Sequence, residues 1–445
     1  MRLSRSSARQ IDALVRLLDR IGRKKETASV GVPRFRTRYS ELPQDDRPYF
    51  FDAILRQMEV AKPDIEDALA EVLESDAEDP IAWSRHLTQL RRRLESPRLR
   101  AFRYFLSTSG GLPFLLDLRA DVLTAHRNSE LDLGPLDEEI AHLFTSWFQA
   151  GFLFLQELTE DSSFRQIRFL KEHDMVHPMA SLEEMGSRLG EDRRLFALYH
   201  RTMPEEPVVF IEAALTQGLV GSIQKILGAE RPPPKSVRDT AIFYSINNTQ
   251  LGLEGLGLGK ALIFQVVELI RKDHPEVKVF STLSPIPGFW EHYLLRILRG
   301  DDATFAMKRA RLPEFFPRRR QLELLEAHRA CTGQAATDFH TALIEILSSS
   351  EWIDEPRYTP LLEKPLTSLS YFYITKEENR RGKPLNPVAA FHLGNGARVS
   401  RANVNFAANP SPRGLRESCG MMVNYVYSDT WLQQLGRTMQ SLLKW

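Results

Sequence analysis

The stretch YSINNTQLGLEGLGLGKALIF, residues 244–264, decides the fold of the second half of the chain. It begins as a short run of aromatic and β-branched residues, passes through Gly252, Gly255, Gly257 and Gly259, and continues as a periodic apolar segment. Glycines let a backbone approach a ligand closely, and a helix N-terminus offers unpaired N–H groups and a favourable dipole. The stretch therefore predicts a strand, a loop suited to an anion, and a helix.

This glycine-rich loop does not match the common nucleotide-binding patterns. No Gly-Lys-Ser/Thr closes it as in a P-loop, and its spacing is not the G-x-G-x-x-G of a Rossmann fold. A G-x-G-x-G spacing before a helix resembles the pyrophosphate loop of GNAT-type acyl-CoA transferases. From the glycines alone, phosphate binding and a structural turn both stay open, and Lys260 is either a further positive charge or a solvated side chain.

The first third of the chain has the periodicity of helices. DIEDALAEVLES (64–75) and LDEEIAHLFTSWFQAGFLFLQEL (136–158) repeat apolar residues at intervals of three and four, and prolines and glycines separate such segments. The basic N-terminus invites a mitochondrial-targeting interpretation, but Asp12 and Asp19 favour a plain first helix. We predict a helical domain at 1–155, formed as a bundle because no fixed-period repeat is present.

Short β-branched and aromatic runs replace this pattern from about residue 165. They are read as strands: RRLFALYHR (193–201), PVVFIEAALT (207–216), TAIFYSIN (240–247), VKVFSTLS (277–284), SLSYFYIT (368–375) and PVAAFHL (387–393). KALIFQVVELIRKDHPE (260–276) is predicted as a helix, and GAERPPPKSVRD (228–239) as a loop because of its three prolines. The predicted fold class is α+β, with an all-α N-terminal domain and a mixed α/β domain at 156–445.

Bulk composition excludes several classes of protein. A formal net charge of +1 over 445 residues argues against a dedicated nucleic-acid binder, and no apolar run reaches the length of about 18 residues that a membrane span needs. Two cysteines, Cys331 and Cys419, fit a reducing compartment and give neither a disulfide framework nor a structural zinc site. His173 and His177 lie four apart, but Pro178 follows at once, so a metal site is disfavoured.

Two serines stand at the end of the apolar run in VKVFSTLSPIPGFWEH (277–292). Strand alternation places Ser281 among apolar neighbours and Ser284 on the other face, at the strand exit beside a proline. The flank LSPIP is not the G-x-S-x-G elbow of α/β-hydrolases, so a nucleophilic serine is disfavoured. His392 ends another apolar run before a Gly-Asn-Gly turn, where a structural and a functional histidine both remain possible.

Five segments together resemble the malonyl-CoA decarboxylase family. They are HPMASLEEMGSRLG (177–190), NTQLGLEGLGLGKALI (248–263), FSTLSPIPGFW (280–290), FHLGNGARVSRANVNFAANPS (391–411) and GMMVNYVY (420–427). The resemblance implies a helical oligomerisation domain joined to a GNAT-like catalytic domain. It implies cleavage of malonyl-CoA to acetyl-CoA and CO₂ without a metal or an organic cofactor. The expected partners are malonyl-CoA and further copies of the chain, as a dimer or tetramer, with no nucleic acid and no membrane.

The resemblance also assigns residues. The family's serine and histidine fall on Ser284 and His392, and a site tyrosine falls on Tyr425. The CoA-contacting loop falls on the seven residues Glu254, Gly255, Leu256, Gly257, Leu258, Gly259 and Lys260. Eukaryotic members tend to carry an acidic residue near Gly257, so any role of that acid does not transfer. The C-terminal SLLKW carries no peroxisomal tripeptide, which suggests a bacterial, cytoplasmic member.

The chemistry of decarboxylation explains why such residues are needed. Loss of CO₂ leaves a thioester enolate, so hydrogen-bond donors must point at the thioester oxygen, and a proton must reach the new carbanion. We expect Ser284 to bind the carboxylate and His392 to govern proton delivery. The alternatives are a GNAT-type acyl-CoA N-acyltransferase, a non-catalytic scaffold with a degenerate CoA-binding domain, and a serine hydrolase. The basic run FFPRRR (315–320) is a candidate for the CoA 3′-phosphate or a solvated loop.

Overall fold

The computed structural model describes residues 4–74, 79–179, 181–228, 237–380 and 382–428. The chain forms two compact units. Unit 1 comprises residues 1–154, 199–208 and 248–258, and unit 2 comprises residues 155–198, 209–247 and 259–445. The chain therefore passes between the units five times, and the last passage falls in the glycine-rich loop, after residue 258.

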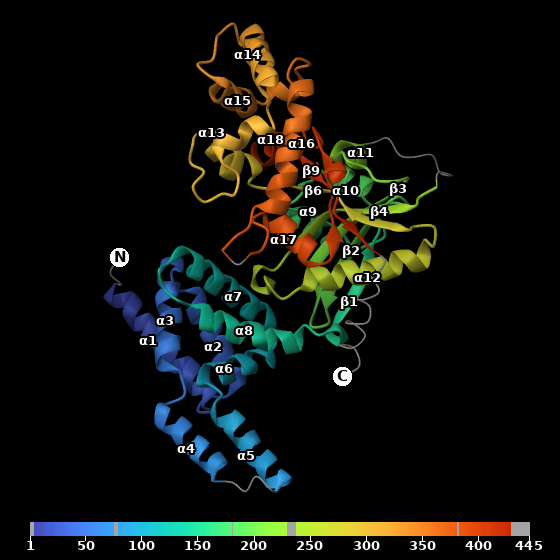
Figure 1. The fold of residues 1–445 in the computed structure, drawn as a ribbon. Coiled ribbons are helices and arrows are strands. Elements are labelled where there is room, and N and C mark those ends of the chain that lie inside the picture. Colours follow the sequence, from blue (N-terminus) through green and yellow to red (C-terminus); the bar gives the residue numbers. More distant parts are fainter. Residues whose placement is uncertain (1–3, 75–78, 180, 229–236, 381, 429–445) are drawn as a thin grey trace. The chain divides into compact units, whose positions relative to one another are not determined.

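Unit 1 is built mainly from helices (Figure 1). They are α1 (Arg5–Gly22), α2 (Ala28–Ser40), α3 (Arg47–Gln57), α4 (Lys62–Leu73), α5 (Pro80–Arg93), α6 (Pro97–Leu106), α7 (Gly111–Asn128) and α8 (Gly134–Trp147), with the short turns η1 (Gln44–Asp46) and η3 (Leu251–Leu253). Several begin at a residue whose side chain accepts from the first-turn backbone, as Ser4, Asp79 and Ser96 do. The predicted amphipathic first helix is confirmed, because its apolar stripe is buried in α1.

The core of unit 1 is aromatic. Phe35 of α2 makes ring contacts with Tyr39, Phe50, Phe105 and Phe114, which come from α2, α3, α6 and α7. The Phe35–Phe105 pair is edge-on, with ring centroids 5.3 Å apart. Edge-on and offset pairs add to the stabilisation that comes from burying their area. Helices from four different parts of the sequence are thus joined at one cluster.

In the part of the chain that the structure describes, two β-sheets lie mainly in unit 2. The strands are β1 (Leu153–Leu158), β2 (Arg193–His200), β3 (Met203–Thr216), β4 (Thr240–Asn248), β5 (Val279–Thr282), β6 (Ser284–Pro285), β7 (Ala397–Arg398), β8 (Val404–Asn405), β9 (Met422–Val423) and β10 (Val426–Tyr427). The larger sheet has the order β1-β2-β3-β4-β5-β10-β7, and the smaller one β6-β9-β8. β4 and β5 are parallel, as the helical crossover between them requires.

Helices accompany these sheets (Figure 1). They are α9 (Phe164–His173), α10 (Leu182–Ser187), α11 (Ile223–Leu227), α12 (Leu258–Asp273), α13 (Leu295–Leu298), α14 (Arg318–Thr332), α15 (Phe339–Ser348), α16 (Thr359–Lys376), α17 (Pro387–Gly394) and α18 (Pro412–Ser418). Short turns are η2 (Ala150–Phe152), η4 (Phe289–Leu294), η5 (Arg309–Glu314), η6 (Glu351–Asp354) and η7 (Arg401–Asn403). The α+β class, helical first and mixed afterwards, is confirmed.

Three secondary-structure predictions are wrong in part. SLSYFYIT lies in α16 rather than in a strand, because Leu362, Leu366, Leu369 and Tyr373 bury one face at helical spacing over a longer window than the aromatic run. PVAAFHL forms α17, so His392 lies on a helix and not at a strand end. The periodic segment 136–158 is helical only to Trp147, after which β1 begins at Leu153. Residues 229–236 of the predicted proline loop and the C-terminal SLLKW lie outside the described residues.

The chain changes sheets at two neighbouring points in unit 2. β5 ends at Thr282 in the larger sheet, and Ser284 then begins β6 in the smaller one. On the return path, β9 pairs with β6 and β10 pairs with β5, so Tyr425 lies between them beside Thr282. The two segments are tied by Thr282 N–H donating to the Tyr425 carbonyl (2.9 Å) and by Asn424 Nδ2 donating to the Thr282 carbonyl (2.8 Å). Polar side chains from distant sequence positions therefore meet here.

Candidate active site

Ser284 lies at the first of these changes of sheet and is 7% exposed. Its hydroxyl donates to Thr282 Oγ1 (3.0 Å), and its Oγ lies 3.3 Å from His392 Nε2. Thr282 and Ser284 share one face of the chain, as the alternation predicted. Ser281 lies on the other face, is fully buried, and donates to the Tyr425 carbonyl (3.1 Å), so its predicted packing role is confirmed. The two serines therefore differ in role: Ser284 contacts His392, whereas Ser281 bonds to the main chain.

His392 comes from the last turn of α17. Asn386 begins this helix: its Oδ1 accepts from Ala389 N–H (2.8 Å), and its Nδ2 donates to the Pro287 carbonyl (2.9 Å). One buried asparagine therefore caps α17 and joins it to the Pro-Ile-Pro turn that follows Ser284. The Asn-Pro pair at the helix start is the sequence signal that the strand interpretation overlooked.

The imidazole of His392 is neutral. It is 4% exposed, and this burial lowers its pKa to about 3. Nδ1 lies 2.8 Å from the hydroxyl of Tyr427, whose pKa burial raises, so that phenol keeps its proton. Because Ser284 donates to Thr282, a consistent arrangement has Nε2–H donating to Ser284 and Nδ1 accepting from Tyr427. The four groups form one uncharged chain of hydrogen bonds.

Tyr425 lies against this chain with its ring stacked on His392, at 4.8 Å between centroids and 25° between planes. It is completely buried, and burial raises the pKa of its phenol far above the ordinary value. Its hydroxyl has no hydrogen-bond partner among the described residues. An unpaired buried hydroxyl costs about 1–3 kcal/mol, so a group kept in this state beside a serine and a histidine is a candidate ligand contact.

The structure brings Ser284, His392 and Tyr425 together, as the resemblance implied. Sequence reasoning missed Tyr427 and Thr282, which complete the hydrogen-bond chain. Strand alternation could have supplied Thr282, which is two residues before Ser284 on the same face. Tyr427 lies two residues after Tyr425 in VNYVY and could have been found in the same way, once the strand β10 was recognised.

The glycine-rich loop has the conformation that its sequence predicted. Gly255 and Gly257 have φ of +82° and +73°, and no atom lies within 4 Å of a Cβ built at either position. These are left-handed conformations that favour glycine, with open space beside the backbone. α12 begins directly afterwards at Leu258 and has 16 residues, so its first N–H groups lack helical partners.

Unit 1 holds the first part of this loop in place. The guanidinium of Arg119, on α7, donates from Nη1 to the carbonyls of Gly252 (2.6 Å) and Glu254 (3.1 Å). Arg119 is 3% exposed and its Nε donates to Asp137 (2.7 Å). The carboxylate of Glu254 pairs with Arg127 at 2.5 Å. The Glu254 carboxylate therefore forms an ion pair within its own unit. Arg119 could not be identified from the sequence, because α7 lies more than a hundred residues before the loop.

The remaining candidates lie elsewhere. Arg318, Arg319 and Arg320 begin α14, where Arg319 pairs with Glu323 (2.8 Å) and Arg320 donates to the Leu361 carbonyl. His173 stacks on Phe169 in α9. Among the described residues, no group of three or more histidine, cysteine, aspartate or glutamate side chains could hold a metal ion. Within the same part of the chain, no helix combines the length and apolarity that crossing a membrane requires.

These observations define an α+β protein with a buried serine–histidine–tyrosine cluster next to a change of sheet. Comparison with known families gives two matches. The malonyl-CoA decarboxylase C-terminal domain matches residues 151–436, and the malonyl-CoA decarboxylase N-terminal domain matches residues 59–148. The chain belongs to the malonyl-CoA decarboxylase family.

Individual relatives agree with this assignment. The chain is 37% identical over 349 residues to mitochondrial malonyl-CoA decarboxylase from Mus musculus, covering 76% of this chain and 67% of that protein. It is 35% identical over 341 residues to the mitochondrial enzyme from Anser anser anser, covering 75% of this chain but only 64% of the goose protein. These two alignments therefore leave about a third of each relative unmatched.

Two solved structures match nearly the whole chain. The crystal structure of malonyl-CoA decarboxylase from Rhodopseudomonas palustris has a TM-score of 0.76 at 30% identity and covers 97% of this chain and 96% of that one. The enzyme from Agrobacterium vitis gives 0.74 at 28% identity, with 96% and 94% covered. The fold is thus shared with these proteins over nearly all of the chain.

Proposed function

We propose that the chain decarboxylates malonyl-CoA to acetyl-CoA and CO₂ without a metal or an organic cofactor. The observation that carries the proposal is the uncharged chain Tyr427–His392–Ser284, with the unpaired hydroxyl of Tyr425 beside it, in a member of the malonyl-CoA decarboxylase family. Mitochondrial relatives named malonyl-CoA decarboxylase support it further.

The reaction breaks one C–C bond. The electron pair of that bond moves into the thioester, which becomes an enolate; CO₂ leaves, and the former methylene carbon takes up one proton. We assign the hydroxyl of Tyr425 as the donor to the thioester oxygen, because a preorganised donor in a water-poor site stabilises charge that develops there. The hydroxyl of Ser284 is free to turn from Thr282 and donate to the substrate carboxylate.

His392 has the properties of a relay rather than of a charged acid. With its pKa lowered to about 3, it does not rest as a cation at neutral pH. A neutral imidazole has one donor and one acceptor nitrogen, so it can release the proton at Nε2 while the hydroxyl of Tyr427 passes its proton to Nδ1. A proton from solvent then restores the Tyr427 phenol before the next turnover. We assign His392 to proton delivery on this basis, with Tyr427 fixing which ring nitrogen carries the hydrogen.

We assign residues 254–260 to the phosphates of CoA. The open backbone at Gly255 and Gly257 and the N-terminus of α12 support this assignment, since together they offer N–H groups to an anion. The order β4, glycine loop, α12 and parallel β5 also fits the GNAT-like architecture that the sequence predicted.

We make two further proposals, on self-association and on cellular location. We propose that the chain self-associates through its helical unit, because α4 and α5 expose Leu73 (81%) and Ile81 (72%). We also propose a cytoplasmic location, because both Cys331 and Cys419 are free thiols. Light scattering of the purified chain and of an Ile81→Lys variant tests the proposed self-association. A monomeric mass for both proteins would count against it.

The activity is tested with purified protein and malonyl-CoA alone. We expect CO₂ and acetyl-CoA in the absence of any amine, and a fall in kcat of about 10²- to 10⁴-fold in His392→Asn and in Ser284→Ala. Ser281→Ala is the matched control, because Ser281 is also buried but lies on the other face of the strand. Turnover that requires an amine would point to an acyltransferase, and release of free CoA with malonate would point to a hydrolase. Near-wild-type turnover in both site variants would remove these residues from the mechanism.

A further inference from the structure

His177 lines a cavity in unit 2, outside the cluster described above. His177 is 9% exposed, and its Nε2 is buried without a hydrogen-bond partner among the described residues. It lines a cavity of about 860 Å³ together with residues of α11, α17, α18 and the Pro-Ile-Pro turn. A polar atom without a partner, in a cavity of ligand size, is the kind of group that a bound molecule satisfies.

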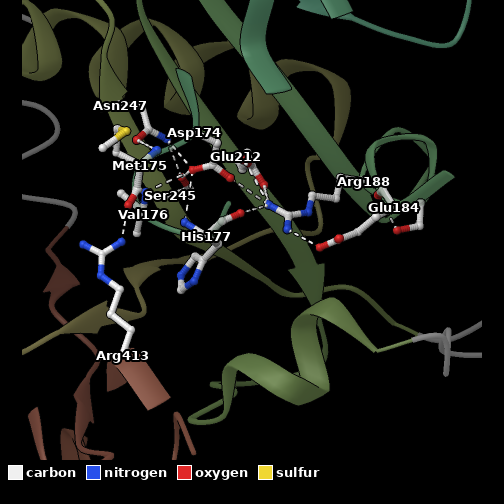
Figure 2. A network of polar contacts seen from close by, with 11 residues as sticks. Asp174, Met175, Val176, His177, Glu184, Arg188, Glu212, Ser245, Asn247 and Arg413 are labelled. Atoms are coloured by element: carbon white, nitrogen blue, oxygen red, sulfur yellow. Dashed lines mark hydrogen bonds and ion pairs between the residues drawn. The ribbon is translucent and has the colours of Figure 1, made fainter. Parts of the chain in front are cut away.

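The main chain of His177 is clamped by a buried polar network. Its N–H donates to Asp174 Oδ1 (3.1 Å), and its carbonyl accepts from Arg188 Nη1 (2.9 Å). Asp174 and Arg188 are themselves paired at 3.0 Å, and Ser245 and Asn247 donate to the same aspartate. Figure 2 shows that the imidazole points away from this network, so the network fixes the residue without using its ring.

The ring is uncharged and accepts hydrogen bonds at its unpaired nitrogen. Burial lowers the pKa of His177 to about 4, and a hydrogen bond to the Tyr244 main chain opposes this shift. A bond that raises the pKa of a histidine is one in which the ring is the donor. Because Nε2 has no partner among the described residues, we assign the ring hydrogen to Nδ1, so that Nε2 presents a lone pair.

The rest of the lining favours an apolar, uncharged ligand. Five prolines contribute rigid apolar walls: Pro178, Pro285, Pro287, Pro410 and Pro412. The charges of the lining residues balance, because Arg188 pairs with Glu184 (2.7 Å) and Arg413 pairs with Glu417 (2.8 Å). Arg413 also donates to the Met175 carbonyl (2.5 Å). No surplus positive charge is therefore available for a phosphate or a carboxylate.

We infer that this cavity binds uncharged small molecules that have an apolar body and an O–H or N–H group, which donates a hydrogen bond to His177 Nε2. Alcohols and amides have this chemistry, whereas the nucleotide portion of CoA does not. The inference does not depend on the proposed decarboxylation, because it concerns binding to residues outside the Ser284–His392 cluster.

Two isomeric probes of formula C₆H₁₄O test it. 1-Hexanol has an O–H donor, and methyl pentyl ether has the same atoms without one. In ligand-observed NMR titrations of the full chain, we expect 1-hexanol to bind saturably and about three- to tenfold more tightly than the ether, as one net hydrogen bond predicts. In His177→Leu the two probes should bind alike. His173→Leu, which changes a histidine outside the cavity, should keep the wild-type ratio.

A second variant keeps the inference testable if His177→Leu fails to fold. Gln224 is an exposed lining residue on α11, and Gln224→Trp should fill part of the cavity and weaken both probes. Absence of saturable 1-hexanol binding to the wild-type chain would overturn the inference. So would an unchanged preference for the alcohol in folded His177→Leu, or unchanged 1-hexanol binding in Gln224→Trp.

Discussion

The buried polar side chains around His392 and those around Asp174, both in unit 2, differ in charge. The group around His392 contains only hydroxyls and a neutral imidazole, and one of its hydroxyls, that of Tyr425, is unpaired. The group around Asp174 contains a guanidinium shared by carboxylates, with Arg188 in contact with Asp174, Glu184 and Glu212 (Figure 2). Buried charges are retained only when they are paired, whereas an unpaired neutral group is tolerated at modest cost. The first group is therefore available to a substrate, and the second holds the structure.

The largest effect is expected when Arg188, the cation that these carboxylates share, is removed. Arg188→Leu leaves Asp174 buried without its ion pair, so we expect a loss of about 3–5 kcal/mol in the free energy of unfolding. Chemical denaturation measures it. Arg319→Leu, which breaks an exposed pair with Glu323, is the control and should cost less than about 1 kcal/mol. Equal effects of the two substitutions would mean that the buried network does not carry stability.

The next largest effect concerns activity alone. Tyr425→Phe removes a hydroxyl that bonds to nothing in the described chain, so stability should be unchanged or slightly higher. If that hydroxyl meets the thioester oxygen, kcat should fall about 10²- to 10³-fold, as for other single donors of this kind. Steady-state kinetics and a thermal melt on the same sample check both halves. A destabilised variant with normal kcat would contradict the assignment.

A smaller effect is expected at Tyr427, which acts through His392. Tyr427→Phe removes the bond to Nδ1 and frees the ring to carry its hydrogen on either nitrogen, so we expect about a tenfold fall in kcat with KM little changed. The ¹⁵N chemical shifts of His392 should report a changed tautomer. Unaltered shifts together with reduced kcat would mean that Tyr427 contributes to packing instead.

The pH dependence of stability tests the charged group in a different way. Burial, reinforced by the charge of Asp174, raises the pKa of Glu212 from 4.5 to about 8. The folded chain then binds the proton more tightly than the unfolded chain, so this contribution is complete below about pH 4.5 and is lost as pH rises through 8. Glu212→Gln should flatten that decline in denaturation curves recorded from pH 5 to 9. An unchanged slope would show that another group titrates there.

The sequence was most informative where one short window determines the local structure. Glycines before an apolar periodic run predicted the loop and α12, and strand alternation separated Ser281 from Ser284. It was misleading at α16 and α17, where aromatic and β-branched residues dominate a short window but burial follows helical spacing or an Asn-Pro cap. Alternation in VNYVY points to Tyr427 itself, but its bond to His392 could not be predicted, and neither could the contacts of Arg119, because each joins segments that only the folded chain brings together.

The anchoring of the glycine-rich loop has a consequence for how this chain can be divided or recombined. Arg119, which holds the carbonyls of Gly252 and Glu254, belongs to the N-terminal helices, whereas the loop follows a strand of the sheet. A shortened chain that begins at residue 155 would keep the loop and lose its anchor. A chimaera that exchanges the first 154 residues between relatives would inherit the conformation of the loop from one parent and its sequence from the other. The N-terminal helices therefore cannot be removed or exchanged without affecting the loop, although none of their described residues belongs to the Ser284–His392 cluster.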